Sequence, residues 1–204
     1  MSSGNRIPVI TINREYGAGG RTIAKGLSER FGIPWYDQDI ITEIARDTGY
    51  SEEDIQNAGE RLSKFDLFID SFPGSSINYV SIHDNIFEVQ KNEILRLAEK
   101  PCIIVGRLSN VILKSENIET FDIFLYADFE KRMKHIGELG ENGSHDLKKF
   151  VEKRDALRSN YYKHYSGNNF NSCHNYDICI DTGRIPKEKI IDIISEAVRS
   201  YGIE

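Results

Sequence analysis

Long apolar runs, a set of paired cysteines and an excess of positive charge are all missing from this sequence of 204 residues. No stretch approaches the ~20 consecutive apolar residues that a membrane-spanning helix needs, and residues 1–6 lack the apolar core of a secretory signal peptide. The three cysteines are too few, and odd in number, to build a disulfide framework. These absences predict a cytoplasmic protein without a membrane partner.

The balance of charge limits the partners further. The chain carries 26 Lys and Arg against 32 Asp and Glu, which gives a net charge of −6. Because nucleic-acid backbones demand a basic protein surface, this balance predicts no nucleic-acid partner. A small phosphorylated ligand needs only a few arginines placed locally, and the sequence supplies candidates for that.

Short apolar runs alternate with helical patterns along the whole chain, which is typical of an α/β fold with a mostly parallel sheet. Five runs are expected to be strands, at residues 9–12, 35–36, 102–105, 121–126 and 176–181. Helices are expected at residues 22–31, 37–48, 82–99, 128–136, 144–162 and 186–201, with a further helix start at 51–54 and an irregular stretch at 62–80. Ser144 is expected to cap one helix and Pro186 to occupy the first turn of another. Ligands of such sheets bind beyond the carboxyl ends of the strands.

A glycine-rich turn, Arg14-Glu15-Tyr16-Gly17-Ala18-Gly19-Gly20-Arg21-Thr22, follows the first strand. Glycines let the backbone approach a ligand closely, and the exposed amides with the next helix N-terminus then attract phosphate. This is the logic of a P-loop, whose full motif reads Gly-x4-Gly-Lys followed by Ser or Thr. Here Arg14 holds the position of the first glycine and Gly20 that of the lysine, while Arg21 follows. The alternative is a turn that only joins a strand to a helix.

Four blocks spread over nearly the whole chain resemble the cytidylate kinase-like family of nucleoside-monophosphate kinase relatives. They are Ile12 to Arg21, Ile104 to Arg107 followed by Val111-Ile112-Leu113, Arg154 to Lys163, and Tyr176 to Thr182. The resemblance implies one P-loop three-layer α/β domain over residues 1–204, with a five-stranded parallel sheet. It also implies a helical acceptor-site insertion at about residues 50–100 and a lid at about 140–165. The reaction implied is transfer of the γ-phosphoryl group of ATP, with Mg²⁺, to CMP or dCMP.

The resemblance and the phosphate turn together assign roles to individual residues. Catalytic roles are expected for Arg21, Arg132 and Arg158, a donor site for Arg14, Gly17, Ala18, Gly19, Gly20, Arg21 and Thr22, and an acceptor site for Asp37, Arg107, Asp155 and Arg158. Thr22 is the expected magnesium ligand, since its hydroxyl follows the turn. Arg21 is the candidate for the missing cation, although arginine differs from lysine in reach and geometry.

Each role has a structural alternative. Arg21 could instead be a surface arginine in the first helical turn. Arg107 could form a salt bridge at the sheet edge, and Asp37 could cap a helix. Arg132, Arg154 and Arg158 lie in charged helical segments, which are usually solvated faces. Asp155 either orients Arg158 or contributes to the acceptor site. Tyr161, Tyr162 and Tyr165 either stack on a base or pack their helix against the domain.

Two other functions remain open at this point. The absence of the P-loop lysine suits a nucleotide-binding module without kinase chemistry. Residues 62–80 do not match the acceptor-binding elements of these kinases, which suits a kinase for a different small acceptor.

Overall fold

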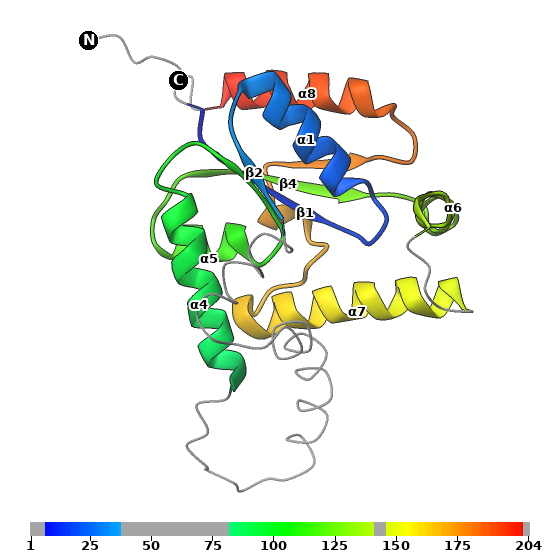
Figure 1. The fold of residues 1–204 in the computed structure, drawn as a ribbon, viewed down its shortest axis with the longest axis horizontal. Coiled ribbons are helices and arrows are strands. Elements are labelled where there is room, and N and C mark those ends of the chain that lie inside the picture. Colours follow the sequence, from blue (N-terminus) through cyan, green and yellow to red (C-terminus); the bar gives the residue numbers. More distant parts are fainter. Residues whose placement is uncertain (1–6, 38–81, 141–145, 202–204) are drawn as a thin grey trace, which may run out of the picture.

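A five-stranded parallel sheet forms the centre of the molecule in the computed structural model, which describes residues 7–37, 82–140 and 146–201 (Figure 1). The strands lie in the order β2-β3-β1-β4-β5, so that β1 is central. Their bounds are β1 Val9–Arg14, β2 Trp35–Tyr36, β3 Ile103–Val105, β4 Thr120–Tyr126 and β5 Ile178–Asp181. All four pairs of neighbours are parallel, which confirms the predicted α/β fold of the P-loop type.

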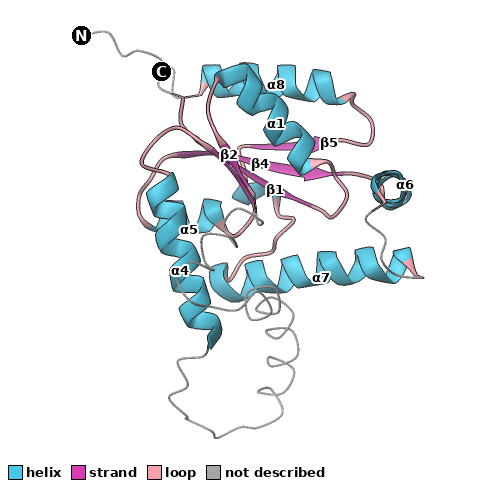
Figure 2. Ribbon diagram, in the orientation of Figure 1, coloured by secondary structure: helices cyan, strands magenta, loops and turns pink. Residues whose placement is uncertain are grey.

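Helices cover both faces of this sheet (Figure 2). On one face lie α1 (Gly20–Phe31) and α8 (Lys187–Ser200), and on the other lie α4 (Ile82–Leu97), α5 (Ser109–Ser115) and α7 (Leu147–Ser166). Helix α6 (Phe129–Leu139) stands beyond the carboxyl end of β4, and a short 3₁₀ turn, η1 (Cys173–Asn175), precedes β5. The result is a three-layer arrangement.

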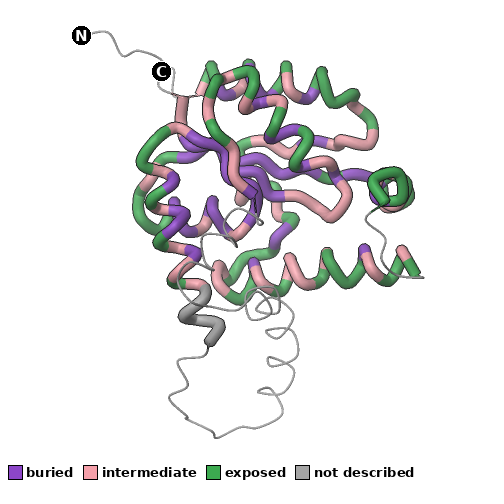
Figure 3. The backbone as a smooth tube through the Cα atoms, in the orientation of Figure 1, coloured by how far each residue is buried: buried purple, intermediate pink, exposed green. Residues whose placement is uncertain are grey.

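The core divides into two halves because alternate residues of a strand point to opposite faces. Ile10 and Ile12 of β1 pack toward α1 and α8, whereas Val9 packs toward α4 and α5. Strand β3 repeats the pattern with Ile103 and Ile104 on opposite sides. Burial on both faces explains the unbroken apolar runs of the strands, and Figure 3 shows the buried residues gathered along them.

Local signals explain most helix ends, and some expectations need correction. Helix α1 ends at Phe31, where the sequence predicted its end, and Gly32 caps it with a left-handed φ of 67°. Asp146 caps α7 by accepting a hydrogen bond from the Lys149 amide at 3.1 Å, whereas Ser144, the expected cap, lies outside the described residues. Pro186 precedes α8 as its N-cap and does not occupy its first turn.

Helix α5 follows β3 almost at once and was not predicted as a helix. Its 7 residues are too few to show a clear helical period, and the block Val111-Ile112-Leu113 resembles a strand equally well. The helix expected after Asp37, the helix start at 51–54 and the irregular stretch 62–80 fall outside the described residues. No helix in the three described ranges is both long enough and apolar enough to cross a bilayer.

A buried carboxyl group between β1 and β4 leads to a prediction about pH. Thr11 Oγ1 donates a hydrogen bond of 2.6 Å to Asp122 Oδ1, and burial raises the pKa of Asp122 above its usual range. A raised carboxyl pKa means that the native state binds this proton more tightly than the unfolded state does. The contribution to stability is therefore fully present below the unfolded-state pKa and is lost as the pH rises through the folded-state pKa.

We expect Asp122→Asn to remove this dependence, because an amide keeps the acceptor for Thr11 and does not titrate. The unfolding free energy of the variant, minus that of the wild type, should grow as the pH rises from about 4, the ordinary aspartate value, through the raised pKa. Urea unfolding at a series of pH values measures it. A difference that stays flat over that range would contradict the prediction.

Candidate functional site

The site lies where three neighbouring strands end. The phosphate turn follows β1, residues Gly106 to Leu108 follow β3, and Ala127 follows β4. Because all of these strands are parallel, their carboxyl ends meet at one edge of the sheet, which is where open α/β sheets bind ligands. The structure therefore brings the turn and the second block of the sequence together, as the order of the strands requires.

Glycine is required at two positions of the turn. Gly17 has φ 83°, and a Cβ there would lie 2.8 Å from Ile136 Cδ1 and 3.0 Å from the backbone oxygen of Arg132. Gly19 has φ 77° and caps α1 without any side-chain hydrogen bond to the helix amides. The first turn of this 12-residue helix is consequently left to attract an anion through its amides.

Arg132 holds the turn from behind. Its guanidinium donates to the Tyr16 carbonyl at 2.9 Å and to the Ala127 carbonyl at 3.1 Å, and it pairs with Asp155 Oδ2 at 2.6 Å. Its Nε also lies 3.2 Å from Glu15 Oε2. The side chain is only 7% exposed, so these partners replace its water. Arg132 thus joins α6, the turn and α7 from an inner position.

Glu15, an acid inside a glycine-rich turn, is a site residue that the sequence analysis missed. Its carboxylate accepts a hydrogen bond from the Ala127 amide at 3.1 Å as well as facing Arg132. Burial raises the pKa of Glu15, and the Ala127 hydrogen bond and Arg132 oppose that rise. The sequence did contain a signal for it. Glu15 is a carboxylate within a turn expected to bind phosphate, and a bound phosphate would repel a carboxylate that had no cationic partner.

Helix α7 contacts the turn through two of the residues expected in the lid. Asp155 Oδ1 accepts a hydrogen bond of 2.7 Å from the Tyr16 amide. Arg158 donates from Nη1 to the Arg14 carbonyl at 3.1 Å, and its guanidinium lies 5.0 Å from the centre of the Tyr16 ring. Burial lowers the pKa of Arg158 to about 10, against the opposing effect of Asp155. Neither side chain lies on a solvated helix face.

Arg14 is surrounded by other charged side chains of the site. Burial lowers the pKa of its guanidinium well below the usual value, and the nearby cations Arg158, Arg107 and Arg21 lower it further. Asp37 is the carboxylate that opposes this effect. Three arginines from other parts of the chain therefore lie close enough to repel Arg14, in a protein whose net charge is −6.

Arg21 and Asp37 form a pair at the side of β2. The Nε of Arg21 lies 2.6 Å from Asp37 Oδ2, with the arginine side chain 53% exposed and the carboxylate 7% exposed. Thr22, the next residue of α1, is exposed. The structure thus directs Arg21 toward a carboxylate, and it leaves the Thr22 hydroxyl accessible in the first turn of the helix.

Arg107 sits in unusual backbone. Gly106, Arg107 and Leu108 have φ values of 80°, 59° and 58°, so three consecutive residues are left-handed. Such backbone costs free energy for residues other than glycine and gathers at functional sites. The Gly106 amide is fixed by a 2.9 Å hydrogen bond to the Ile12 carbonyl, which ties this segment to β1.

Two buried polar residues, Asn13 and Asn110, were also missed. Asn13 Nδ2 donates to Asn110 Oδ1 at 2.9 Å, and Asn110 Nδ2 donates to the Tyr162 hydroxyl at 3.1 Å. This buried chain joins β1, α5 and α7. Tyr162 is therefore a packing residue, and Tyr165 stacks on Phe87 of α4 with ring centres 4.1 Å apart. The sequence could not show that Asn13 and Asn110 belong to one network, because their partners are distant along the chain.

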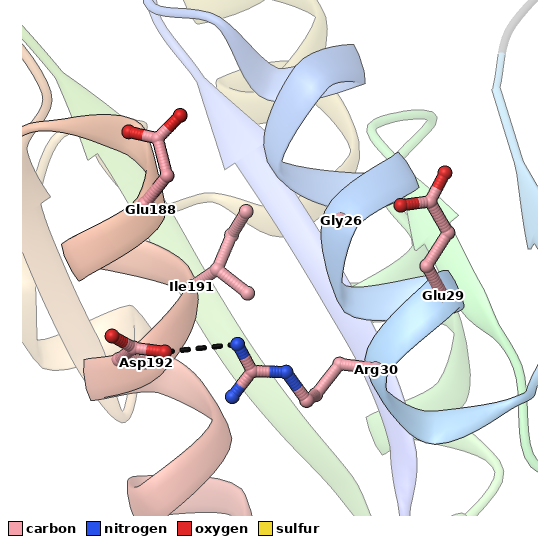
Figure 4. A pocket seen from close by; sticks show the side chains of 6 residues that line it. All are labelled: Gly26, Glu29, Arg30, Glu188, Ile191 and Asp192. Carbon is pink, nitrogen blue, oxygen red and sulfur yellow. Dashed lines mark hydrogen bonds and ion pairs between the residues drawn. The ribbon is translucent and has the colours of Figure 1, made fainter.

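A shallow depression between α1 and α8 lies away from this site (Figure 4). It is lined by Gly26, Glu29, Arg30, Glu188, Ile191 and Asp192. Arg30 pairs with Asp192 at 2.9 Å, which leaves the carboxylates in excess. This surface does not suit a phosphate ligand, whereas the edge of the sheet beside the turn does.

Comparison with known proteins places the chain in a family. The model of the cytidylate kinase-like family matches residues 9–184. The cytidylate kinase of Methanothrix thermoacetophila is 26% identical over 193 residues, covering 94% of this chain and 98% of that protein. An uncharacterised protein from Eubacterium ventriosum shares the fold with a TM-score of 0.71 at 24% identity, covering 95% and 99% of the two chains. Shikimate kinase from Acinetobacter baumannii shares it with a TM-score of 0.57 at 16% identity, covering 97% and 96%. Since the match extends over most of the sequence, this chain belongs to the cytidylate kinase-like family.

Proposed function

We propose that this protein is a nucleoside-monophosphate kinase that transfers the γ-phosphoryl group of ATP to CMP or dCMP. The observation that carries the proposal is the gathering of four arginines around a glycine turn at the carboxyl edge of a parallel sheet. Phosphoryl transfer depends chiefly on positioning and on neutralising negative charge. The family membership and the similarity to cytidylate kinases support cytidine nucleotides as acceptors.

The turn and the start of α1 are the proposed donor site. The amides of residues 17–20 and the helix N-terminus would hold the ATP phosphates. Transfer breaks the bond between the γ-phosphorus and the oxygen that bridges to the β-phosphate. It forms a new bond to a phosphate oxygen of the acceptor and leaves ADP. Arg158, which reaches the turn from α7, would neutralise charge on the moving group.

The acceptor side is proposed to lie between β3 and α7. Arg107 projects from left-handed backbone at the end of β3, and a guanidinium can hold a phosphate by two parallel hydrogen bonds. Asp37 and Arg21 border this side as a pair. Asp155 and Arg132 are proposed as positioning residues, because their polar atoms bind the turn and each other.

Magnesium fits the residues present. Mg²⁺ prefers oxygen ligands and usually takes few from the protein, completing its shell with phosphate oxygens and water. The accessible Thr22 hydroxyl supplies one such oxygen beside the proposed donor site. When bound there, the ion would neutralise phosphate charge. No cluster of three or more His, Cys, Asp or Glu capable of holding a metal occurs among the described residues, so the phosphates and water would supply the remaining ligands.

The test is an assay of ADP production with Mg-ATP and each of CMP, dCMP, UMP, AMP and GMP. We expect turnover with the cytidine nucleotides, and we expect Arg107→Met to raise the KM of the acceptor at least tenfold, since a charge-assisted phosphate contact is lost. Arg30→Met is the matched control, because that arginine pairs with Asp192 between α1 and α8, away from the site.

Two other outcomes have clear meanings. A rise in melting temperature with Mg-ATP, without ADP production from any nucleoside monophosphate, would contradict the kinase proposal. It would favour a nucleotide-binding module, the second candidate, for which the missing lysine is the specific observation. Turnover with other nucleoside monophosphates and none with CMP or dCMP would overturn the cytidine preference alone.

A further inference from the structure

We propose that Arg14, from the position of the first P-loop glycine, supplies the phosphate-binding cation that the motif's lysine supplies elsewhere. The two substitutions in the motif are then one exchange: the cation moves to position 14, and position 20 becomes glycine to make room for it. This inference rests on the proposed donor site, and it differs from the expectation that Arg21 is the replacement.

The path of the Arg14 side chain is the first observation. A Cβ placed on Gly20 would lie 3.1 Å from Arg14 Cγ, 3.2 Å from Cδ and 3.5 Å from Nε. The stem of Arg14 therefore runs directly over the position from which the lysine side chain of the full motif would start. Any longer residue at position 20 would meet Arg14 within its first bonds.

A second glycine, Gly106, leaves room for the end of the Arg14 side chain. A Cβ on Gly106 would collide with Arg14 Nη1 and would lie 3.2 Å from its Cζ. The guanidinium thus lies against the left-handed segment that carries Arg107. Two glycines from distant parts of the chain, Gly20 and Gly106, line the course of one arginine.

The charges around Arg14 give the third observation. The groups that influence its guanidinium are three arginines and one carboxylate, and no hydrogen bond is among them in the described part of the chain. That carboxylate, Asp37, is already paired with Arg21 at 2.6 Å. Arg132 shows the contrast, because carbonyl and carboxylate oxygens take up its donors. A polyphosphate bound beside Arg14 would relieve the repulsion and accept its hydrogen bonds.

The same contacts argue against Arg21 in this role. Its Nε faces Asp37, and its side chain lies more than half exposed at the β2 side of the turn. Arg14 is only partly exposed, and its side chain runs from beside Gly20 of the turn to beside Gly106. The guanidinium that would act in place of the lysine is therefore the one whose stem already occupies the lysine's space.

The experiment is an exchange of the two residues. We would compare the wild type, Arg14→Gly, Gly20→Lys and the double variant Arg14→Gly/Gly20→Lys for Mg-ATP affinity by calorimetry, without any acceptor. We expect Arg14→Gly to weaken binding at least tenfold. Gly20→Lys alone should also weaken it, because its stem meets Arg14 and adds a fifth cation. The double variant should recover to within about threefold of the wild type, since a charge-assisted phosphate contact is restored.

Controls separate charge from folding. Arg14→Met keeps most of the stem, and the Arg158 bond to the Arg14 carbonyl is to the backbone and survives either change. We expect Arg14→Met to keep or raise the melting temperature of the protein alone, while the rise caused by Mg-ATP is lost. Arg30→Gln, in the last turn of α1 and paired with Asp192 outside the site, should bind Mg-ATP as the wild type does.

Other results would overturn the inference. Mg-ATP affinity in Arg14→Gly equal to that of the wild type would do so, even if CMP-dependent ADP production continued and the kinase proposal stood. A folded double variant that binds no better than Arg14→Gly would do so as well. A wild type that binds Mg-ATP without turnover would contradict the kinase proposal alone. The Mg-ATP affinities of Arg14→Gly and of the double variant would then still support or overturn the role of Arg14.

Discussion

Replacing Arg132 by methionine is expected to lower the free energy of unfolding by about 3 kcal/mol, the cost of removing one partner from a buried ion pair. Arg132 is 7% exposed, while the Glu15 and Asp155 carboxylates that face it are 25% and 28% exposed. These carboxylates keep some water, which is why we expect the lower end of the range known for such losses. The Tyr16 and Ala127 carbonyls would lose their donor at the same time.

Arg132→Lys should recover little of that loss, because a single ammonium cannot reach carbonyls and carboxylates on several sides as a planar guanidinium does. Urea unfolding measures both variants. Arg184→Met, an exposed arginine paired at 3.3 Å with Asp181, is the control and should change stability by less than about 0.5 kcal/mol. An Arg132→Met protein as stable as this control would show that the contacts around Arg132 do not hold the turn.

Gly106→Ala is expected to damage both stability and donor binding. The residue has φ 80°, and left-handed backbone costs an L-residue about 1–2 kcal/mol. The added methyl group would also meet the Arg14 guanidinium and force it to move. We therefore expect the unfolding free energy to fall by at least about 1 kcal/mol and the Kd for Mg-ATP to rise at least tenfold.

Gly137→Ala is the matched control for this change. Gly137 lies in α6 with ordinary backbone and nothing within 4 Å of an added Cβ. Alanine favours a helix over glycine by about 1 kcal/mol, so this variant should be as stable as the wild type or more stable. If Gly106→Ala lowered stability but left Mg-ATP affinity unchanged, the position of the Arg14 guanidinium would not matter for binding.

The sequence was a good guide to the fold because the signals for it are local. The apolar run from Val9 and the glycines after it predict a strand, a turn and a helix within a short stretch. The other strands show similar apolar runs. The order in which the strands lie is a different matter. It depends on pairings such as Ile10 with Ile103 and Phe121, which no local pattern expresses.

The sequence predicted which side chains gather at the turn better than it predicted what those side chains contact. Arg14, Arg107 and Arg158 do gather at the turn, but the pairing of Arg21 with Asp37 and of Arg132 with Glu15 depends on side-chain directions. The glycine at position 20 also could not be interpreted from the sequence alone. Position 20 reads in sequence as a lost lysine, and only the course of the Arg14 side chain shows what fills the space.

The left-handed segment after β3 could not have been predicted either. Gly106 alone suggests a turn, yet Arg107 and Leu108 adopt positive φ values as well, against their own preference. Tertiary contacts hold them there, including the Ile12 carbonyl that accepts from the Gly106 amide and the burial of Leu108. Such strain is visible only when the neighbouring strand is in place.

Carrying the positive charge of the turn on guanidinium groups has a consequence for covalent control. Acetylation removes the charge of a lysine amine, so it can silence a P-loop whose cation is a lysine. Position 20 offers no such amine here, and Arg14 is not a substrate for that modification. Methylation of an arginine keeps its charge and blocks its paired hydrogen bonds. A donor site built on Arg14 would therefore keep its charge while the lysines of the same chain are acetylated.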